Sequence, residues 1–390
     1  MARRILELEQ VMQEKAKPSS GSSRVRRKMT DDNPANEQAG ASYFADSSQR
    51  KDLEFFSSGC VLYDQAVLGG GYVLGRMSNV VGDKSTNKTG QMTEAVVNFL
   101  LKYPDGVVRY AETESAMDLG YAAAMGMPVE LVEWADFKSV KKAKKGTDDA
   151  DVEESDRTVE WVFEDLQRFV KRLKGRPGLY IVDSLDALSD RGELEKGDGD
   201  SGGYGMRKAK ALHELFRRLN GPLEASRCAL LIVSQVKDKI NAVAFGETQM
   251  RTGGHAMDFY ATQVVWLANV GAIKKTISGV ERKIGLLLKA KNKKNKVGLP
   301  LREIEFPLIF GYGIDDVTAN VEWLINVGSE KLLSAVDMSK SGYKLRISKL
   351  RDADDQTELH SVRQKLNAIV VSEWARIEQG FLPKRGKYAK

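Results

Sequence analysis

Two segments of this sequence, residues 179–183 and 228–234, are apolar at every position until a polar residue ends each one. A short, largely apolar run that ends at glycine occurs at 77–82, and a further strand is expected at 107–111. The stretches between the strands repeat apolar residues every three or four positions, as amphipathic helices do. Strands that are buried on both faces and alternate with helices are typical of a parallel sheet covered on both sides. The sequence therefore predicts an α/β fold with a central, mostly parallel sheet, in which ligands bind beyond the carboxyl ends of the strands.

The composition excludes several classes of protein. Only two cysteines, Cys60 and Cys228, and three histidines are present, so a disulfide framework, a zinc ribbon and a protein-only transition-metal site have few candidate ligands. No apolar run approaches the ~20 residues of a membrane helix, and residues 1–4 lack the apolar stretch of a signal peptide. With 42% hydrophobic residues and a net charge of +6, we expect a soluble intracellular protein with no membrane partner.

The chain divides into three regions by composition. Residues 1–55 are rich in Ser, Gly and Asn, and we expect them to form an N-terminal arm and linker. Residues 56–330 contain the alternating strands and helices, and residues 331–390 are expected to form a small, basic α/β region. Within the central region, the segments at about 190–207 and 236–254 are too long for simple connections, which favours functional loops over disordered surface loops.

Lysines cluster in two places. Residues 138–145 contain five lysines and precede an acidic run at 148–156, so this pair of runs indicates a solvated, self-neutralising insertion loop. Residues 289–296 contain five lysines without an acidic residue and directly follow an apolar strand. A basic loop on a rigid element suits a phosphate or a nucleic acid, although a solvated face is the alternative.

A phosphate-binding loop is predicted between the strand at 77–82 and the helix that follows. Lys88 would contact the β- and γ-phosphates of a nucleotide, and Thr89 would ligate Mg²⁺. Asn87 stands where the motif has its second glycine; it is the least costly replacement if that position needs a positive φ, but it weakens binding if its side chain intrudes on the phosphates. Gly90 should loosen the first turn of the helix slightly. The candidate nucleotide-binding residues of this loop are Gly82, Asp83, Lys84, Ser85, Thr86, Asn87, Lys88 and Thr89.

Polar side chains end the next three strands. Glu112 and Glu114 follow the second strand, where a carboxylate could orient and deprotonate water; strand alternation points both the same way and does not choose between them. Asp183 ends the third strand, where it could hold Mg²⁺, and Gln235 ends the fourth, where it could sense a γ-phosphate. Each of these residues alone could be a helix cap, but the order loop, acid, acid and amide on four successive strands is much more specific.

Residues from about 56 to 316 resemble the RecA-class homologous-recombination ATPases, with a likeness to the phage strand-exchange recombinases. The resemblance rests on several stretches in register, namely residues 57–64, the phosphate loop, 112–118, 180–184, 252–260 and 294–314. The start of the basic helix, Met206-Arg-Lys-Ala-Lys210, is what resembles the phage branch. The likeness implies a RecA-like P-loop core.

The resemblance implies roles for particular residues. Glu114 matches the catalytic glutamate, and the match selects it over Glu112. Gln235 matches the glutamine that links the γ-phosphate to DNA. The remaining matches are Lys88 and Thr89 of the Walker-A motif, Asp183 of the Walker-B motif, Asp118 and Tyr121 at the adenine, and Lys294 and Lys296 at the ATP of a neighbouring subunit.

What the resemblance implies about activity is a DNA-dependent ATPase that uses ATP and Mg²⁺. It would polymerise into a helical filament on single-stranded DNA, pair it with double-stranded DNA and exchange strands, in the cytoplasm of a bacterial cell or a phage-infected host. Single-strand-binding or loader proteins would be further partners. The candidate DNA-binding residues are Arg207, Lys208, Lys210, Lys237, Lys239, Ile240, Phe245, Arg251, Thr252, Gly253 and Gly254. Among them, the apolar side chain of Ile240 or Phe245 would insert between bases.

Several residues depart from the family pattern. Asn87 replaces a glycine, His255 stands where bacterial members have a small amide, and the family's polymerisation element has no clear match within residues 1–55. Two alternatives therefore stay open: a helicase-type motor that closes into a ring, and a catalytically weak DNA-binding paralogue or mediator.

Overall fold

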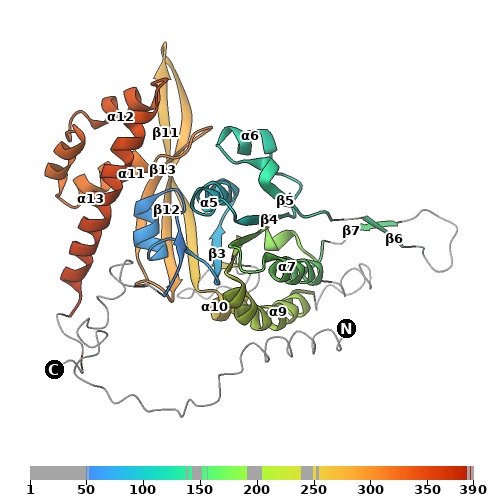
Figure 1. Ribbon diagram of the computed structural model, residues 1–390. Coiled ribbons are helices and arrows are strands. Elements are labelled where there is room, and N and C mark those ends of the chain that lie inside the picture. The colour runs from blue at the N-terminus through green and yellow to red at the C-terminus, as the bar shows by residue number, and fades with distance from the viewer. Residues whose placement is uncertain are drawn as a thin grey trace. The chain divides into compact units, whose positions relative to one another are not determined.

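A ten-stranded sheet forms the centre of the computed structural model, which describes residues 50, 52–137, 139–142, 152–155, 157–190, 204–238, 249–251, 254–383 and 387 (Figure 1). Six strands run parallel to their neighbours in the order β11-β3-β9-β8-β4-β5, and β12, β13 and β14 extend the sheet antiparallel beyond β11. The strand bounds are β3 (Met77–Gly82), β4 (Val107–Glu112), β5 (Val132–Trp134), β8 (Gly178–Asp183), β9 (Cys228–Asp238), β11 (Gln263–Ile277), β12 (Val280–Asn295), β13 (Glu303–Ile309) and β14 (Gly313–Ile314). The predicted α/β fold with a mostly parallel sheet is confirmed.

Helices cover both faces of this sheet, so the strands are buried on two sides. The side chains of β8 alternate: Leu179 and Ile181 join the core under α5, and Tyr180 and Val182 join the core under α7 and α9. The bounds of the main helices are α5 (Lys88–Lys102), α7 (Val159–Leu173), α9 (Tyr204–Ser226), α10 (Gly254–Tyr260), α11 (Asp316–Asn326), α12 (Tyr343–Arg351) and α13 (Thr357–Phe381). No helix in these described ranges is long and apolar enough to span a membrane.

Shorter elements connect the main ones. They are β1 (Phe55–Phe56), α4 (Val61–Tyr63), η2 (Asp64–Leu68), β2 (Tyr72–Val73), α6 (Leu119–Ala124), η3 (Val129–Leu131), β6 (Ser139–Lys142), β7 (Val152–Ser155), η4 (Leu185–Ala187), β10 (Gln249–Arg251) and η5 (Glu330–Val336). The N-terminal arm, residues 1–49, lies outside the described residues.

The C-terminal region is helical where the structure describes it, so the expectation of an α/β tail is wrong. Residues 330–381 form η5, α12 and α13, with no strand among them. The reason is the spacing of Leu359, Val362, Leu366 and Val370, which places all four on one side of α13, where they are buried in the core cluster that also includes residues of α11. Residues 41–382 form one compact unit, and the functional boundary near residue 330 stays a prediction.

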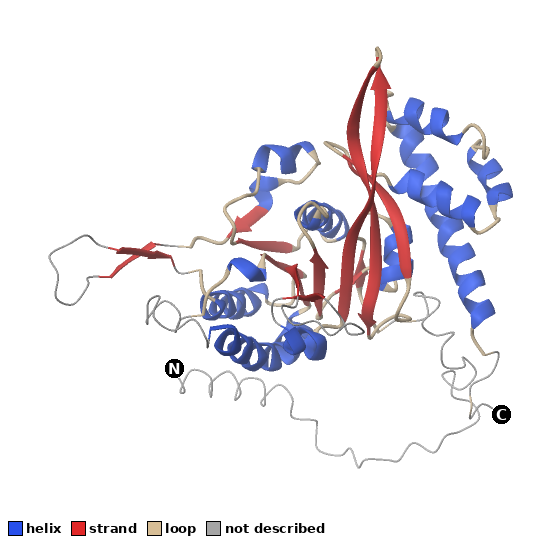
Figure 2. Cartoon of the chain, turned by 180° about the vertical axis from the view of Figure 1, so that it is seen from behind, coloured by secondary structure: helices blue, strands red, loops and turns tan. Residues whose placement is uncertain are grey.

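Two antiparallel hairpins extend beyond the parallel strands of the central sheet (Figure 2). β11 pairs with β3 only as far as Leu267 but with β12 as far as Ile277, so its outer half is a two-stranded ribbon. The lysine-rich and acidic runs at 138–156, which predicted an insertion loop, include the hairpin β6–β7 instead. In its backbone register, residue 139 pairs with residue 155 and residue 142 with residue 152.

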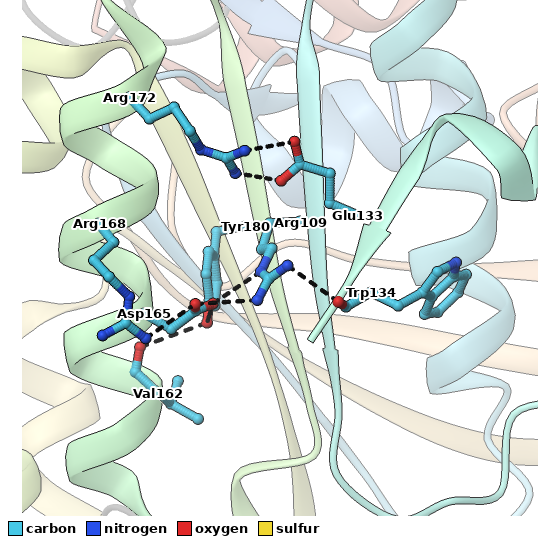
Figure 3. A network of polar contacts seen from close by, with 8 residues as sticks. All are labelled: Arg109, Glu133, Trp134, Val162, Asp165, Arg168, Arg172 and Tyr180. Carbon is cyan, nitrogen blue, oxygen red and sulfur yellow. Dashed lines mark hydrogen bonds and ion pairs between the residues drawn. The ribbon is translucent and has the colours of Figure 1, made fainter. Parts of the chain in front are cut away.

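A buried ion pair ties α7 to the sheet (Figure 3). The guanidinium of Arg109 on β4 donates two hydrogen bonds to the carboxylate of Asp165 on α7, at 2.9 and 3.1 Å, and a third to the carbonyl of Trp134 on β5. The hydroxyl of Tyr180 on β8 donates to Asp165 at 2.9 Å. Burial and the neighbouring carboxylate raise the pKa of Tyr180 well above its usual range, which keeps its hydroxyl available as a donor. One carboxylate thus positions α7 on β4 and β8.

We predict that Arg109→Ala lowers the free energy of unfolding by about 3 kcal/mol, because it leaves the buried Asp165 carboxylate without its main partner. Urea denaturation followed by circular dichroism measures this change. The matched control is Arg172→Ala, which removes an ion pair to Glu133 whose arginine side chain is 52% exposed, and should cost less than about 1 kcal/mol. Equal losses in the two variants would contradict the structural role of the buried pair.

Candidate nucleotide-binding site

The predicted phosphate loop joins β3, which ends at Gly82, to α5, which begins at Lys88. The carbonyl of Asp83 accepts hydrogen bonds from the Thr86 hydroxyl at 2.8 Å and from the Lys88 ammonium at 2.7 Å, so the loop closes on itself. Asn87 has a φ of 57°, in the left-handed region. The condition under which asparagine is the least costly replacement for glycine is therefore met.

Asp183, at the end of β8, lies beside the first turn of α5. One of its carboxylate oxygens, Oδ2, accepts hydrogen bonds from the Thr89 and Tyr110 hydroxyls, both at 2.8 Å. Burial raises the pKa of Asp183, and these two donors oppose that shift. Burial has the opposite effect on the Lys88 ammonium, because it lowers the pKa of this cation. Nearby carboxylates, including those of Asp183 and Glu114, oppose this by favouring the charged form.

The oxygens of Thr89 and Asp183 fit Mg²⁺. Mg²⁺ usually takes one or two protein oxygens and completes its octahedron with water and nucleotide phosphates. Within the described ranges, no cluster of three His, Cys, Asp or Glu residues forms an all-protein metal cage. A hydroxyl and a carboxylate next to a phosphate loop are therefore the arrangement expected for a nucleotide-bound Mg²⁺.

The two glutamates that follow β4 differ in their contacts. The carboxylate of Glu112 accepts backbone N–H groups of residues 114, 115 and 116, at 2.8–3.2 Å, and so fixes the loop. Glu114 instead accepts hydrogen bonds from the Gln235 amide, at 3.1 Å, and from the Ser184 hydroxyl. The structure therefore leaves Glu114, rather than Glu112, as the carboxylate that meets the polar end of β9.

A pocket of about 250 Å³ joins these residues. Its lining residues come from α5, from the strand ends and from the segment leading into α6: Asn87, Thr89, Gly90, Thr93, Glu112, Glu114, Ala116, Met117, Asp118, Tyr121, Ala122 and Asp183. Asp118 caps α6 by accepting the N–H of Tyr121, whose hydroxyl in turn accepts the N–H of Gly311 at 3.0 Å. Of the predicted residues, the cavity is lined by Asn87, Thr89, Glu114, Asp118, Tyr121 and Asp183, whereas residues 82–86, Lys88 and Gln235 are not among its lining residues.

Lys294 and Lys296 do not line this pocket. Their ammonium groups donate to backbone carbonyls at the C-terminal end of α10: Lys294 to Asp258 and, at 3.0 Å, to Phe259, and Lys296 to Phe259 at 3.2 Å. Cations are favourable at that end of a helix dipole. Their predicted contact with the ATP of a second subunit is not tested by a single chain.

The DNA-binding candidates are described only in part. The Lys208 ammonium donates to the carbonyls of Leu188 and Asp186, and Lys210 is exposed on α9. Part of the predicted loop 236–254 is regular, because β9 reaches Asp238 and pairs with β10. Only the backbone is described for Arg207, Lys237, Arg251 and Gly254, and Lys239, Ile240, Phe245, Thr252 and Gly253 lie outside the described residues.

Comparison with known families decides the classification. The RecA N-terminal domain family matches residues 39–143 and 162–315, which is more than half of the chain. This chain belongs to the RecA family. The gap in the match, residues 144–161, includes β7 of the charged hairpin and the start of α7.

Individual RecA relatives are similar at moderate identity. The Protein RecA of Trichodesmium erythraeum is 31% identical over 268 residues, 69% of this chain and 66% of the relative. That of Arthrospira platensis is 30% identical over 270 residues, again 66% of the relative, and that of Sulfurimonas denitrificans is 26% identical over 331 residues, 85% of the relative. The match to the first two relatives thus spans about two thirds of their length. The likeness to the phage branch stays a prediction.

Sequence reasoning missed several residues of the site, among them the pocket-lining Thr93, Ala116, Met117 and Ala122. Tyr110 holds Asp183, Ser184 holds Glu114, and Gly90 lines the pocket. Strand alternation could have found Tyr110, since it points to the same side as Glu112. The contacts of Ser184 and Gly90 depend on how the segments that follow the strands are folded, which the sequence pattern does not show.

Glu94 on α5 secures the turn that meets Tyr121. Its carboxylate accepts the N–H of Ile314 on β14 at 2.6 Å, three residues beyond Gly311. Burial raises the pKa of Glu94 to about 8. Because its ordinary value is 4.5, this carboxyl keeps its proton in the folded chain at neutral pH.

We predict that Glu94→Gln removes part of the pH dependence of stability. In the wild type the carboxyl binds its proton more tightly when folded, so this contribution to the free energy of unfolding declines as pH rises from about 4.5 to about 8 and then levels off. Glutamine keeps the oxygen acceptor for Ile314 without titrating. Urea denaturation at pH 6, 7, 8 and 9 should show the variant gaining on the wild type up to pH 8; parallel curves would contradict a protonated Glu94.

Proposed function

We propose that this chain is a DNA-dependent ATPase that polymerises on single-stranded DNA and catalyses homologous pairing and strand exchange in recombination and repair. Membership of the RecA family supports the class of activity. The observation that carries the proposal is the hydrogen bond that Gln235 donates to Glu114, a residue that lines the pocket. It joins the candidate catalytic carboxylate to the strand that continues into the predicted DNA-binding loop.

ATP would occupy the pocket with its phosphates on the loop 82–89. Lys88 and the N-terminus of α5 would bind the β- and γ-phosphates, and Asp118 and Tyr121 would contact the adenine. When bound, Mg²⁺ would neutralise charge on the phosphates, held by Thr89 and Asp183. The alternative of a catalytically weak DNA-binding paralogue or mediator depended on Asn87. The positive φ of Asn87, which asparagine tolerates, supports the active ATPase over that alternative.

Hydrolysis would depend on Glu114, which is placed to orient a water molecule and accept its proton. In the described state Gln235 occupies one oxygen of that carboxylate. The Ser184 hydroxyl donates to the same oxygen. A γ-phosphate that attracted the Gln235 amide would leave Ser184 as the donor to this oxygen and would shift the start of the segment 236–254. DNA held by that segment would act in the reverse direction, since coupling between two sites is reciprocal.

Assembly into a filament would place the ATP of one copy against Lys294 and Lys296 of the next. Head-to-tail contacts that do not close generate helical polymers. Single-stranded and double-stranded DNA would be the nucleic-acid partners, with single-strand-binding or loader proteins as candidates for assembly, in the cytoplasm of a bacterial cell or a phage-infected host.

We predict that Glu114→Gln lowers DNA-stimulated ATP hydrolysis at least ~100-fold, because a positioned general base contributes about that factor or more. Phosphate release measured with and without single-stranded DNA tests this, and a fluorescent ATP analogue checks that the variant still binds nucleotide. Lys88→Ala is the control that should lose binding as well. Wild-type protein without DNA-stimulated turnover, and indistinguishable from Lys88→Ala, would leave the non-catalytic alternative.

We predict filaments on single-stranded DNA with a non-hydrolysable ATP analogue, seen by electron microscopy. The double variant Lys294→Ala/Lys296→Ala should lose them, because the interface would lack the cations that meet the neighbouring nucleotide. Lys291→Ala on the same strand, which removes an ion pair to Glu303, should keep them. Closed rings in place of filaments would favour the helicase-type motor.

A further inference from the structure

The side chain of Asn87 lies directly over Gly90 in the first turn of α5. A Cβ atom added to Gly90 would lie 2.2 Å from Oδ1, 2.6 Å from Nδ2 and 2.7 Å from Cγ of Asn87. These separations are shorter than any van der Waals contact. Only glycine at position 90 therefore allows the Asn87 amide to keep its position, which explains why a residue unfavourable to helices stands in the first turn.

The Asn87 amide is not used by the protein itself. Although Asn87 precedes the helix, its side chain makes no capping hydrogen bond to α5. Its Nδ2 is buried and has no hydrogen-bond partner among the residues that the structure describes. A buried donor without an acceptor is unfavourable, so this N–H group calls for an acceptor supplied by a ligand.

The position of the amide indicates which acceptor this is. Asn87 and Gly90 line the same pocket as Thr89 and Asp183, which are proposed for the terminal phosphates and Mg²⁺, and as Tyr121, which is proposed for the adenine. The part of a nucleotide that lies between the terminal phosphates and the base is the α-phosphate with its sugar. A phosphate oxygen is an acceptor that bonds strongly to an amide N–H.

We infer that the Asn87 side-chain amide donates a hydrogen bond to the α-phosphate of the bound nucleotide, and that Gly90 is required to make room for it. This inference rests on the proposed ATP site and adds a specificity-determining pair to it. The contact would be shared by ATP and ADP, because both carry the α-phosphate. Asn87 would thus bind the nucleotide without distinguishing ATP from ADP. Sensing of the γ-phosphate is the role proposed for Gln235.

Four variants test the pair by titration calorimetry with ADP and with a non-hydrolysable ATP analogue. Asn87→Gly should weaken both ligands by the same factor, about tenfold, as expected for one hydrogen bond to a charged group. Asn87→Asp, of equal size, should weaken them further, because a carboxylate repels phosphate. Gly90→Ala should also weaken both, since its methyl group displaces the Asn87 amide, whereas Asn87→Gly/Gly90→Ala should bind no worse than Asn87→Gly alone.

Each outcome separates the inference from its alternatives. Asn87→Gly that binds ADP like the wild type would overturn the contact, and full binding by Gly90→Ala would overturn the steric pairing. Asn87→Asp that binds as well as or better than the wild type would overturn the phosphate contact, because a carboxylate only accepts hydrogen bonds and its partner would then be a sugar hydroxyl that donates. Melting curves recorded without nucleotide check that each variant folds. Asn87→Gly/Gly90→Ala should melt at a higher temperature than Asn87→Gly, because alanine is more favourable than glycine in a helix.

The proposed function fails separately from this inference. Wild-type protein that binds ADP, with the expected pattern in the four variants, but shows no DNA-stimulated ATPase activity, would overturn the recombinase proposal and leave the Asn87 contact in place. Conversely, the wild type could show DNA-stimulated ATP hydrolysis while Asn87→Gly and Asn87→Asp bind nucleotide with unchanged affinity. That result would overturn only the Asn87 contact.

Discussion

The backbone hydrogen bonds between parallel strands are the constraint on which the site depends. In the register of the sheet, Gly82 on β3 pairs with Gln235 on β9, and Glu112 on β4 pairs with Asp183 on β8. Gly82, Glu112 and Asp183 each end a strand, and Gln235 lies opposite Gly82, three residues before β9 ends. The sheet therefore gathers four residues that are far apart in the sequence near the carboxyl ends of its parallel strands. A shift of one residue in any of these strands would turn its terminal side chain to the opposite face and break up the pocket.

Much of this arrangement could be predicted from the sequence, because burial and strand direction leave clear patterns. The all-apolar runs at 179–183 and 228–234 identified strands covered on both faces, and the motif between β3 and α5 located the loop. For Asn87 the sequence supplied only a condition, that asparagine is the least costly replacement if the position needs a positive φ, and the structure meets that condition. These features are local, or they follow from a rule that holds for parallel sheets in general.

Other features could not be predicted because they depend on tertiary contacts. Alternation could not separate Glu112 from Glu114; the difference arises from the backbone N–H groups that curl around Glu112. The expectation of an α/β tail failed because α13 buries a stripe of side chains in the core shared with α11, a contact with residues more than thirty positions earlier in the sequence. Lys208 was interpreted from its charge alone, yet its ammonium bonds to carbonyls near η4.

The contacts of Lys294 and Lys296 with the end of α10 have a thermodynamic consequence. α10 follows the segment 236–253 directly, and each ammonium group can satisfy only one set of acceptors at a time. In the proposed filament, a phosphate bound to an adjacent molecule would have to compete with the carbonyls of Asp258 and Phe259 as the hydrogen-bond acceptor of these ammonium groups. Breaking the contacts between these lysines and α10 would reduce the net free energy of binding between copies. A change at the end of α10 in one molecule would therefore depend on the nucleotide bound by its neighbour.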